Sequence, residues 1–256
     1  MSEAPRLDLL RPRDIGGLFR DSLNSYFRYF VSWLAIGAAV VVPVEFVVSG
    51  LGLGQLSGNF KSTGRKNEVA VVLAENYLLV GPLITAMVIH ALLAVADGRR
   101  PKTGPAITSG LEAFRPIFVA VLISAAGVVL GLIAFILPGI YLAVRWYFAP
   151  QAVVVDNRRG VQALERSAEL VSGQWWRVFG VLLLVLISVG AAQSAIQAPF
   201  TVLAKSADSS AVWLLGTMVS TAFTAPLEAL MLTLLYFDLL ARRSLPAMVP
   251  PVQPPR

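Results

Sequence analysis

The stretch LPGIYLAVRWYFAPQAVVVD, residues 137–156, is almost wholly apolar, yet it carries an arginine, Arg145, in its interior. Long apolar runs recur through the 256-residue chain, in which 56% of the residues are apolar and 14% are charged. Soluble domains carry about 25% charged residues, whereas a helix of about 20 apolar residues spans a bilayer. The composition therefore predicts an all-α, polytopic integral membrane protein, because helices satisfy their own backbone polar groups in lipid.

Six apolar blocks predict six transmembrane helices that pair as three hairpins. The blocks cover residues 29–53, 68–96, 116–137, 140–155, 178–199 and 211–239. The fourth block is short, and Pro138-Gly139 separates it from the third, which favours a tight turn between two helices over one long helix. We therefore expect a cytoplasmic tail and amphipathic helix at 1–28, a six-helix domain at 29–242 and a proline-rich cytoplasmic tail at 243–256.

Three amphipathic segments each precede a predicted hairpin. Residues 12–23, 105–114 and 160–172 repeat apolar side chains at three- and four-residue spacing, which is typical of one helical stripe. Such helices lie in the plane of the membrane interface. The pattern indicates a threefold repeat of an interfacial helix followed by a hairpin, although any chain that enters a membrane from a basic loop has a similar pattern.

The placement of lysine and arginine predicts the orientation. Most of the 21 basic residues fall in segments 1–28, 97–115, 156–177 and 240–256, which the six predicted spans place on one side of the membrane. Cytoplasmic loops are enriched in lysine and arginine, so we expect both termini in the cytoplasm. The net charge of +6 then reflects orientation, and we expect no nucleic-acid partner.

Residues 137–184 resemble the membrane domain attached to some glycerophosphoryl diester phosphodiesterases and related stand-alone bacterial membrane proteins. The matching positions are Pro138-Gly139, Arg145, Pro150, Ala163-Leu164, Arg166-Ser167 and Trp176-Arg177, and the segments LRPRDIGGLFRDSLNSYFRYF and LLYFDLLARR fit the two ends. Asp156 stands where the family usually carries a glutamate. The resemblance implies six spans in a bacterial inner membrane and little about mechanism. The phosphodiesterase barrel needs about 250 residues, so we expect it to be absent and the protein not to be an enzyme.

The residue types exclude several kinds of chemistry. The chain has no cysteine, which excludes disulfides and thiolate metal sites, and its one histidine, His90, cannot build a multi-histidine metal site. It has no Gly-x-Ser-x-Gly elbow and no Walker loop. We therefore expect no catalytic residue, metal or cofactor.

Five ionisable residues inside the predicted spans form the candidate site: Glu45, Glu75, His90, Arg145 and Glu228. Charges at membrane depth are costly and face the interior of a bundle. A rise of about 1.5 Å per residue places Glu45, Glu75 and Arg145 in an outer layer, and His90 and Glu228 in an inner layer. We expect Arg145 to pair with Glu75 or Glu45, and the alternative is that it snorkels to the outer headgroups.

Two functions fit these features. The first is a non-enzymatic membrane module that binds lipid or acts as an accessory or scaffold. Its partners would be anionic headgroups at the cytoplasmic face, where each basic residue contributes about 1 kcal/mol. The alternative is a carrier or flippase-like transporter of a lipid-like or small anionic substrate, supported by buried charges and by prolines in four spans. A polar cavity open to one side would favour the carrier, and a dry core the module.

Overall fold

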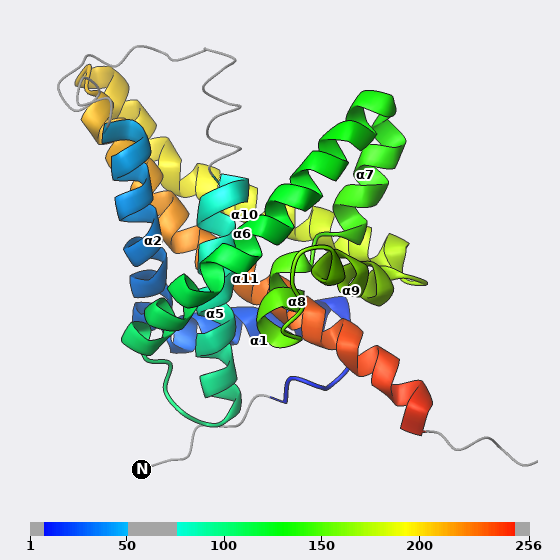
Figure 1. Cartoon of the computed structure of the whole chain (residues 1–256). Coiled ribbons are helices and arrows are strands. Elements are labelled where there is room, and N and C mark those ends of the chain that lie inside the picture. Colours follow the sequence, from blue (N-terminus) through cyan, green and yellow to red (C-terminus); the bar gives the residue numbers. More distant parts are fainter. Residues whose placement is uncertain (1–7, 51–75, 249–256) are drawn as a thin grey trace, which may run out of the picture.

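The computed structural model describes residues 8–50 and 76–248, and all regular structure in this part of the chain is helical (Figure 1). The elements are α1 (Ile15–Arg28), α2 (Phe30–Gly50), the π-helix η1 (Asn76–Val80), α5 (Gly81–Ala96), α6 (Thr103–Ala134), α7 (Ile136–Arg145), α8 (Ala149–Val155), α9 (Val161–Val171), α10 (Trp175–Ser206) and α11 (Ser210–Met248). Five segments are long and apolar enough to cross a membrane: Phe30–Val47, Asn76–Ala96, Thr103–Ala134, Trp175–Ser206 and Ser210–Ser244. The prediction of an all-α chain is confirmed for the described residues.

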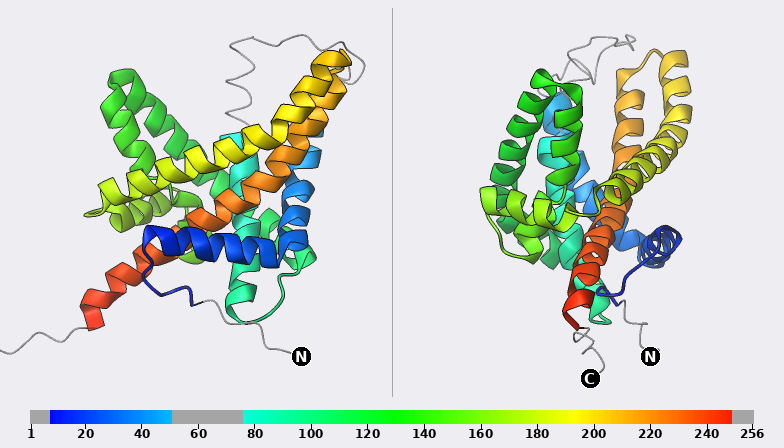
Figure 2. Two further views of the ribbon diagram at one scale, coloured as in Figure 1. Left: turned by 180° about the vertical axis from the view of Figure 1, so that it is seen from behind. Right: turned by 90° about the vertical axis from the view of Figure 1, so that its right-hand side faces the viewer.

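Helix α11 passes through the middle of the fold and packs against α1, α2, α5 and α10. Its second half is the most buried part of the protein, with Leu230, Leu234 and Leu239 fully enclosed. Helices α6 and α7 form one hairpin and α10 and α11 another, and the two hairpins are separate arms in the views of Figure 2. Both hairpin tips lie on the side where α2 ends, whereas α1 lies crosswise at the opposite end of the bundle (Figure 1).

Two of the three predicted amphipathic segments are separate helices, and the other is part of a longer helix. Residues 12–23 and 160–172 correspond to separate helices, α1 and α9, but residues 105–114 are the beginning of the continuous helix α6. A glycine with positive φ, Gly173, stands between α9 and α10 and ends the first of them, because this conformation cannot continue a helix. No such residue interrupts α6, which continues through Pro116. All three predicted segments are therefore helical, but the second continues directly into a long apolar helix.

The turn between α6 and α7 lies at Phe135, which has an extended conformation, and not at Pro138-Gly139 as predicted. Pro138 occupies the first turn of α7, where its missing N–H has no intrahelical partner to lose. Gly139 packs against α6. A Cβ added to Gly131 of α6 would lie only 3.0 Å from the Cα of Gly139. The proline therefore starts a helix and the glycine permits close packing of two backbones.

The predicted fourth span is broken. Helix α7 ends at Arg145 and α8 begins at Ala149, with Pro150 in its first turn. Helix α11 continues to Met248, past the predicted start of the tail at residue 243.

Candidate functional site

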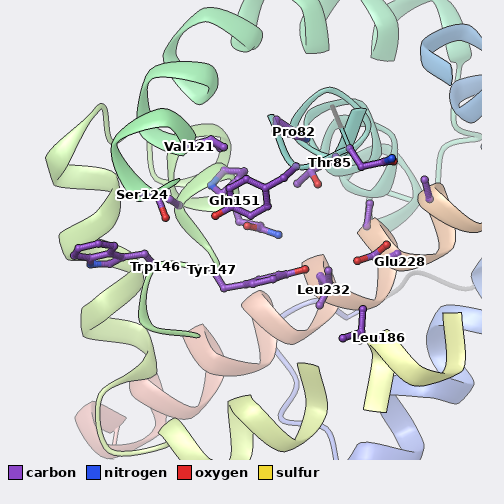
Figure 3. A pocket seen from close by; sticks show the side chains of 17 residues that line it. Pro82, Thr85, Val121, Ser124, Trp146, Tyr147, Gln151, Leu186, Glu228 and Leu232 are labelled. Carbon is purple, nitrogen blue, oxygen red and sulfur yellow. The ribbon is translucent and has the colours of Figure 1, made fainter. Parts of the chain in front are cut away.

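A cavity of about 320 Å³ lies inside the bundle, beside the break between α7 and α8 (Figure 3). Its walls come from η1, α5, α6, α8, α10 and α11 and from residues of the break itself. We call this space the core cavity. The residues that line it are Asn76, Tyr77, Gly81, Pro82, Thr85, Val121, Ser124, Trp146, Tyr147, Ala149, Pro150, Gln151, Leu186, Ala225, Glu228, Ala229 and Leu232.

Two interruptions of regular α-helix form one side of the core cavity. The π-helix η1 precedes Gly81-Pro82, and the break between α7 and α8 precedes Pro150. Short π-helical turns occur frequently at functional sites. Pro150 lies in the first turn of α8, where it removes no intrahelical hydrogen bond, whereas Pro82 directly follows the π-helical turn of η1. The interruptions therefore place two segments of irregular backbone beside the core cavity.

Several polar side chains in the core cavity have no partner within the described residues. Ser124 Oγ and Gln151 Oε1 make no hydrogen bond, and each of these side chains belongs to a residue that is only 2% exposed. Glu228 forms no hydrogen bond or ion pair in the described part of the chain, and the hydroxyl of Tyr147 extends towards it across the cavity (Figure 3). An unsatisfied buried polar group costs about 1–3 kcal/mol, so these groups favour an occupant that supplies hydrogen bonds.

A serine of α9 holds the break beside the core cavity in place. Ser167 Oγ accepts a hydrogen bond from the backbone N–H of Phe148 (3.1 Å) and donates one to the carbonyl of Arg145 (2.8 Å). The break leaves both backbone groups without an intrahelical partner. Ser167 is fully buried, so its hydroxyl replaces the water that would otherwise satisfy them.

Replacing Ser167 by Ala should lower the free energy of unfolding by about 1–3 kcal/mol, because it leaves a buried N–H and a buried carbonyl unsatisfied. The measurement is thermal or denaturant unfolding of the purified protein in detergent, followed by tryptophan fluorescence. Ser172→Ala is the matched control, since Ser172 is exposed at the end of the same helix. Equal effects of the two substitutions would contradict the proposed role of the Ser167 hydroxyl.

Two crevices open at the end of the bundle where α1 lies, and they share Arg100. One, of about 470 Å³, lies between α5 and α6; the other, of about 530 Å³, lies beside the junction of α1 and α2. We call them the basic crevices. Their basic residues are His90, Arg99, Arg100 and Lys102 in the first and Arg28 and Arg100 in the second. The four lysine and arginine side chains are exposed, and among the described residues only Arg99 has an ion pair, with Asp97.

A fully buried carboxylate, Asp238, joins three distant segments. It accepts a hydrogen bond from the backbone N–H of Arg13 (2.7 Å) and forms ion pairs with Arg177 (2.7 Å) and Arg242 (3.0 Å). Both arginines also donate to the carbonyl of Arg13. The segment before α1 is thereby bound to the start of α10 and the end of α11.

A second cluster surrounds Asp156, which follows α8. Its carboxylate accepts hydrogen bonds from Arg166 and from the hydroxyl of Tyr236. Partial burial acts against the charge of the Arg166 guanidinium, but its pKa is nevertheless raised by the hydrogen bond and the charge of Asp156. Arg243 donates to the carbonyls of Glu169 and Ser172 at the end of α9. Several of the arginines that supported the predicted orientation therefore form ion pairs or hydrogen bonds within the fold.

The structure separates the five candidate residues. Glu228 lines the core cavity and His90 a basic crevice, so the two residues lie in separate pockets. Glu45 is buried on α2, outside the residues that line the cavity, and Glu75 lies outside the described residues.

The side chain of Arg145 contacts Tyr141, which precedes it by one turn on α7. Its guanidinium donates to the Tyr141 hydroxyl (2.8 Å) and lies over the ring at 5.7 Å. Among the described residues it forms no ion pair with Glu45, and Glu75 lies outside them, so the predicted pairing with Glu75 or Glu45 stays a prediction. Arg145 is ten residues from the turn at Phe135, which is about 15 Å along a helix.

Sequence reasoning missed Asp238, Ser124 and Gln151. A signal for Asp238 was available, because it is the one charged residue in LLYFDLLARR before Arg242, and the four-residue spacing allows an ion pair along a helix. Nothing local marks Ser124 or Gln151, since their importance comes from the absence of partners.

Comparison with known proteins gives one family match. The model described as Domain of unknown function (DUF7847) matches residues 69–239, which is most of the chain. No curated protein and no solved structure matches the chain. The resemblance of residues 137–184 to the membrane domain of glycerophosphoryl diester phosphodiesterases therefore stays a prediction.

Proposed function

This chain belongs to the family described as Domain of unknown function (DUF7847), so its role has to be argued from its own structure, and we propose that it is a non-enzymatic integral protein of a bacterial inner membrane that binds anionic lipid at the cytoplasmic face. The proposal has two parts: six membrane crossings with both termini in the cytoplasm, and a lipid site at the basic crevices.

Exposed apolar surface supports the membrane part. The hairpin of α6 and α7 carries large apolar side chains with little cover: Ile133 is 76% exposed, Phe135 76% and Leu137 79%. Contiguous apolar surface of this kind marks contact with a membrane or another protein. The five long apolar segments, together with the broken pair α7 and α8 as the fourth, make six crossings.

The arrangement of the ends supports the orientation. The start of α1 and the end of α11 lie on one side of the bundle (Figure 1). The loop between α5 and α6, with Arg99, Arg100 and Lys102, lies on that side too, whereas Lys205 is near the tip of the hairpin of α10 and α11. Cytoplasmic loops are enriched in lysine and arginine, so we assign this side to the cytoplasm.

The basic crevices carry the lipid part of the proposal. Arg100 stands between them, with Arg28 on one side and Lys102 on the other, and all three side chains are exposed. The exposed apolar side chains of Phe27 and Val31 belong to the wall beside Arg28. A lipid needs both features, since its phosphate binds cations and its acyl chains cover apolar surface. Basic pockets between transmembrane helices are suited to anionic headgroups.

Replacing Arg100 by Gln should weaken binding of phosphatidylglycerol by about fivefold, the effect of losing about 1 kcal/mol from one cation. The measurement is native mass spectrometry of the detergent-purified protein, titrated with phosphatidylglycerol and with phosphatidylcholine of the same acyl chains. Lys205→Gln is the matched control, because it removes one exposed cation at the far end of the bundle. Equal binding of the two lipids, or equal losses in the two variants, would contradict the proposal.

The core cavity supports a carrier as a second candidate. A binding space beside a broken helix is the arrangement that many carriers use. The described lining contains one carboxyl, Glu228, and no lysine, arginine or histidine. That lining does not favour the small anionic substrate expected from the sequence, and a carrier built on this cavity would take a different class of molecule.

A further inference from the structure

We propose that the core cavity binds the protonated amine of an amphiphilic molecule, with Glu228 as its counter-ion. The site is separate from the basic crevices and has the opposite charge. The proposal does not depend on the binding of anionic lipid, because no residue is shared between the two regions.

The charge of the lining selects a cation. Among the described residues that line the cavity, Glu228 is the one ionisable acid or base apart from the two tyrosines, and it has no ion pair in the described part of the chain. A carboxylate without a partner is costly in an apolar space. A bound ammonium group would offset that cost through a charge-assisted hydrogen bond, which is stronger than a neutral one.

The other polar groups suit the hydrogen atoms of an amine. An ammonium group offers three donors and no acceptor, so it needs oxygen atoms around it. The Ser124 hydroxyl and the Gln151 amide oxygen lack partners among the described residues, and both residues line the same cavity as Glu228 (Figure 3). A cation with N–H groups fits these acceptor oxygen atoms. An anion would face the same acceptors, and no basic residue in the described lining would neutralise its charge.

The rest of the lining suits an apolar body attached to the amine. Trp146, Tyr147 and Tyr77 contribute aromatic rings to the wall, and rings attract cations that lie over their faces. Leu186 and Leu232 add aliphatic surface. A volume of about 320 Å³ is at the lower end of the range for small-molecule sites, about 300–1,000 Å³. The ligand class is therefore a compact amine with an apolar body, or the amine end of a longer lipid.

Three probes that share one apolar body test the charge preference. They are 4-phenylbutylamine, which is cationic at pH 7, the neutral 4-phenylbutanol and the anionic 4-phenylbutyrate. Binding is measured by isothermal titration calorimetry of the protein in a neutral detergent. We expect the amine to bind the wild-type protein about tenfold more tightly than the alcohol, which is the effect of one charge-assisted hydrogen bond, and the anion to bind more weakly than either.

Glu228→Gln tests the role of the carboxyl with almost no change in shape. The advantage of the amine over the alcohol should fall to less than about threefold, while affinity for the alcohol stays the same. Glu112→Gln is the matched control, because Glu112 is an exposed glutamate on α6 outside the core cavity. In Arg100→Gln the preference for the amine should be unchanged, which separates this site from the basic crevices.

Further variants and a pH series keep the proposal open to refutation if Glu228→Gln does not fold. Gln151→Leu and Ser124→Ala should each weaken the amine by several-fold and leave the alcohol unaffected. Affinity for the amine should rise with pH, because only the ionised carboxylate of Glu228 can act as a counter-ion. The proposal is overturned if the amine and the alcohol bind equally, if the anion binds best, or if Glu228→Gln and Glu112→Gln give the same result.

Discussion

Replacing Asp238 by Ala is expected to lower the free energy of unfolding by about 3–5 kcal/mol, because two arginines then lose the buried carboxylate that neutralises them. Asp238 is fully buried, and its side chain binds Arg177, Arg242 and the backbone N–H of Arg13. The segment before α1 should also become susceptible to proteolysis, since this contact binds it to α10 and α11. Denaturant unfolding in detergent measures the first effect and limited trypsin digestion the second.

Asp97→Asn is the control for this prediction. Asp97 forms an ion pair with Arg99 at 2.6 Å, but both side chains are exposed, and exposed pairs contribute only about 0–1 kcal/mol. The triple variant with Asp238→Ala, Arg177→Met and Arg242→Met should recover much of the loss, because it removes the unpaired charges. A loss in Asp238→Ala no larger than that in Asp97→Asn would show that the cluster does not stabilise the fold.

Replacing Gly37 by Ala is expected to cost about 3 kcal/mol or more, the upper end of the range for overpacked cores. Gly37 lies where α2 packs against α11. A Cβ at this position would stand against the carbonyl oxygen of Ala222 and 2.8 Å from Cγ of Pro226. A backbone atom cannot rotate away as a side chain can, so the two helices would have to separate. Thermal unfolding and the yield of monodisperse protein measure the effect.

Gly180→Ala is the matched substitution in α10, where nothing lies within 4 Å of an added Cβ. Alanine is a better helix former than glycine by up to about 1 kcal/mol, so this variant should be neutral or slightly stabilised. If Gly37→Ala behaves in the same way, the close packing of α2 on α11 is not required for stability.

Local sequence patterns predicted the helices better than their ends. The apolar blocks correspond to α2, α5, α6, α10 and α11 because a long apolar run determines burial and helix formation together. The turn near Pro138-Gly139 was misplaced by three residues, because proline and glycine have the same local preference at the start of a helix as in a turn. The extended conformation of Phe135 has no local sequence signal.

The candidate sites show the same difference. Glu228 could be selected from the sequence because a glutamate in an apolar run is rare and costly. Its surroundings could not, since Tyr147 and Gln151 come from a segment far away in the chain and meet it only through packing.

The sequence by itself determined the class of this protein: an all-helical chain with long apolar segments, basic residues near their ends and no cysteine-based or multi-histidine chemistry. These properties are additive along the chain, so composition and spacing are enough to read them. Only the tertiary structure decided that Asp238 binds two arginines, that Ser167 holds the break between α7 and α8, and that Ser124, Gln151 and Glu228 share one cavity without partners. Each of these depends on which helix faces are in contact, and many packings satisfy the same apolar pattern.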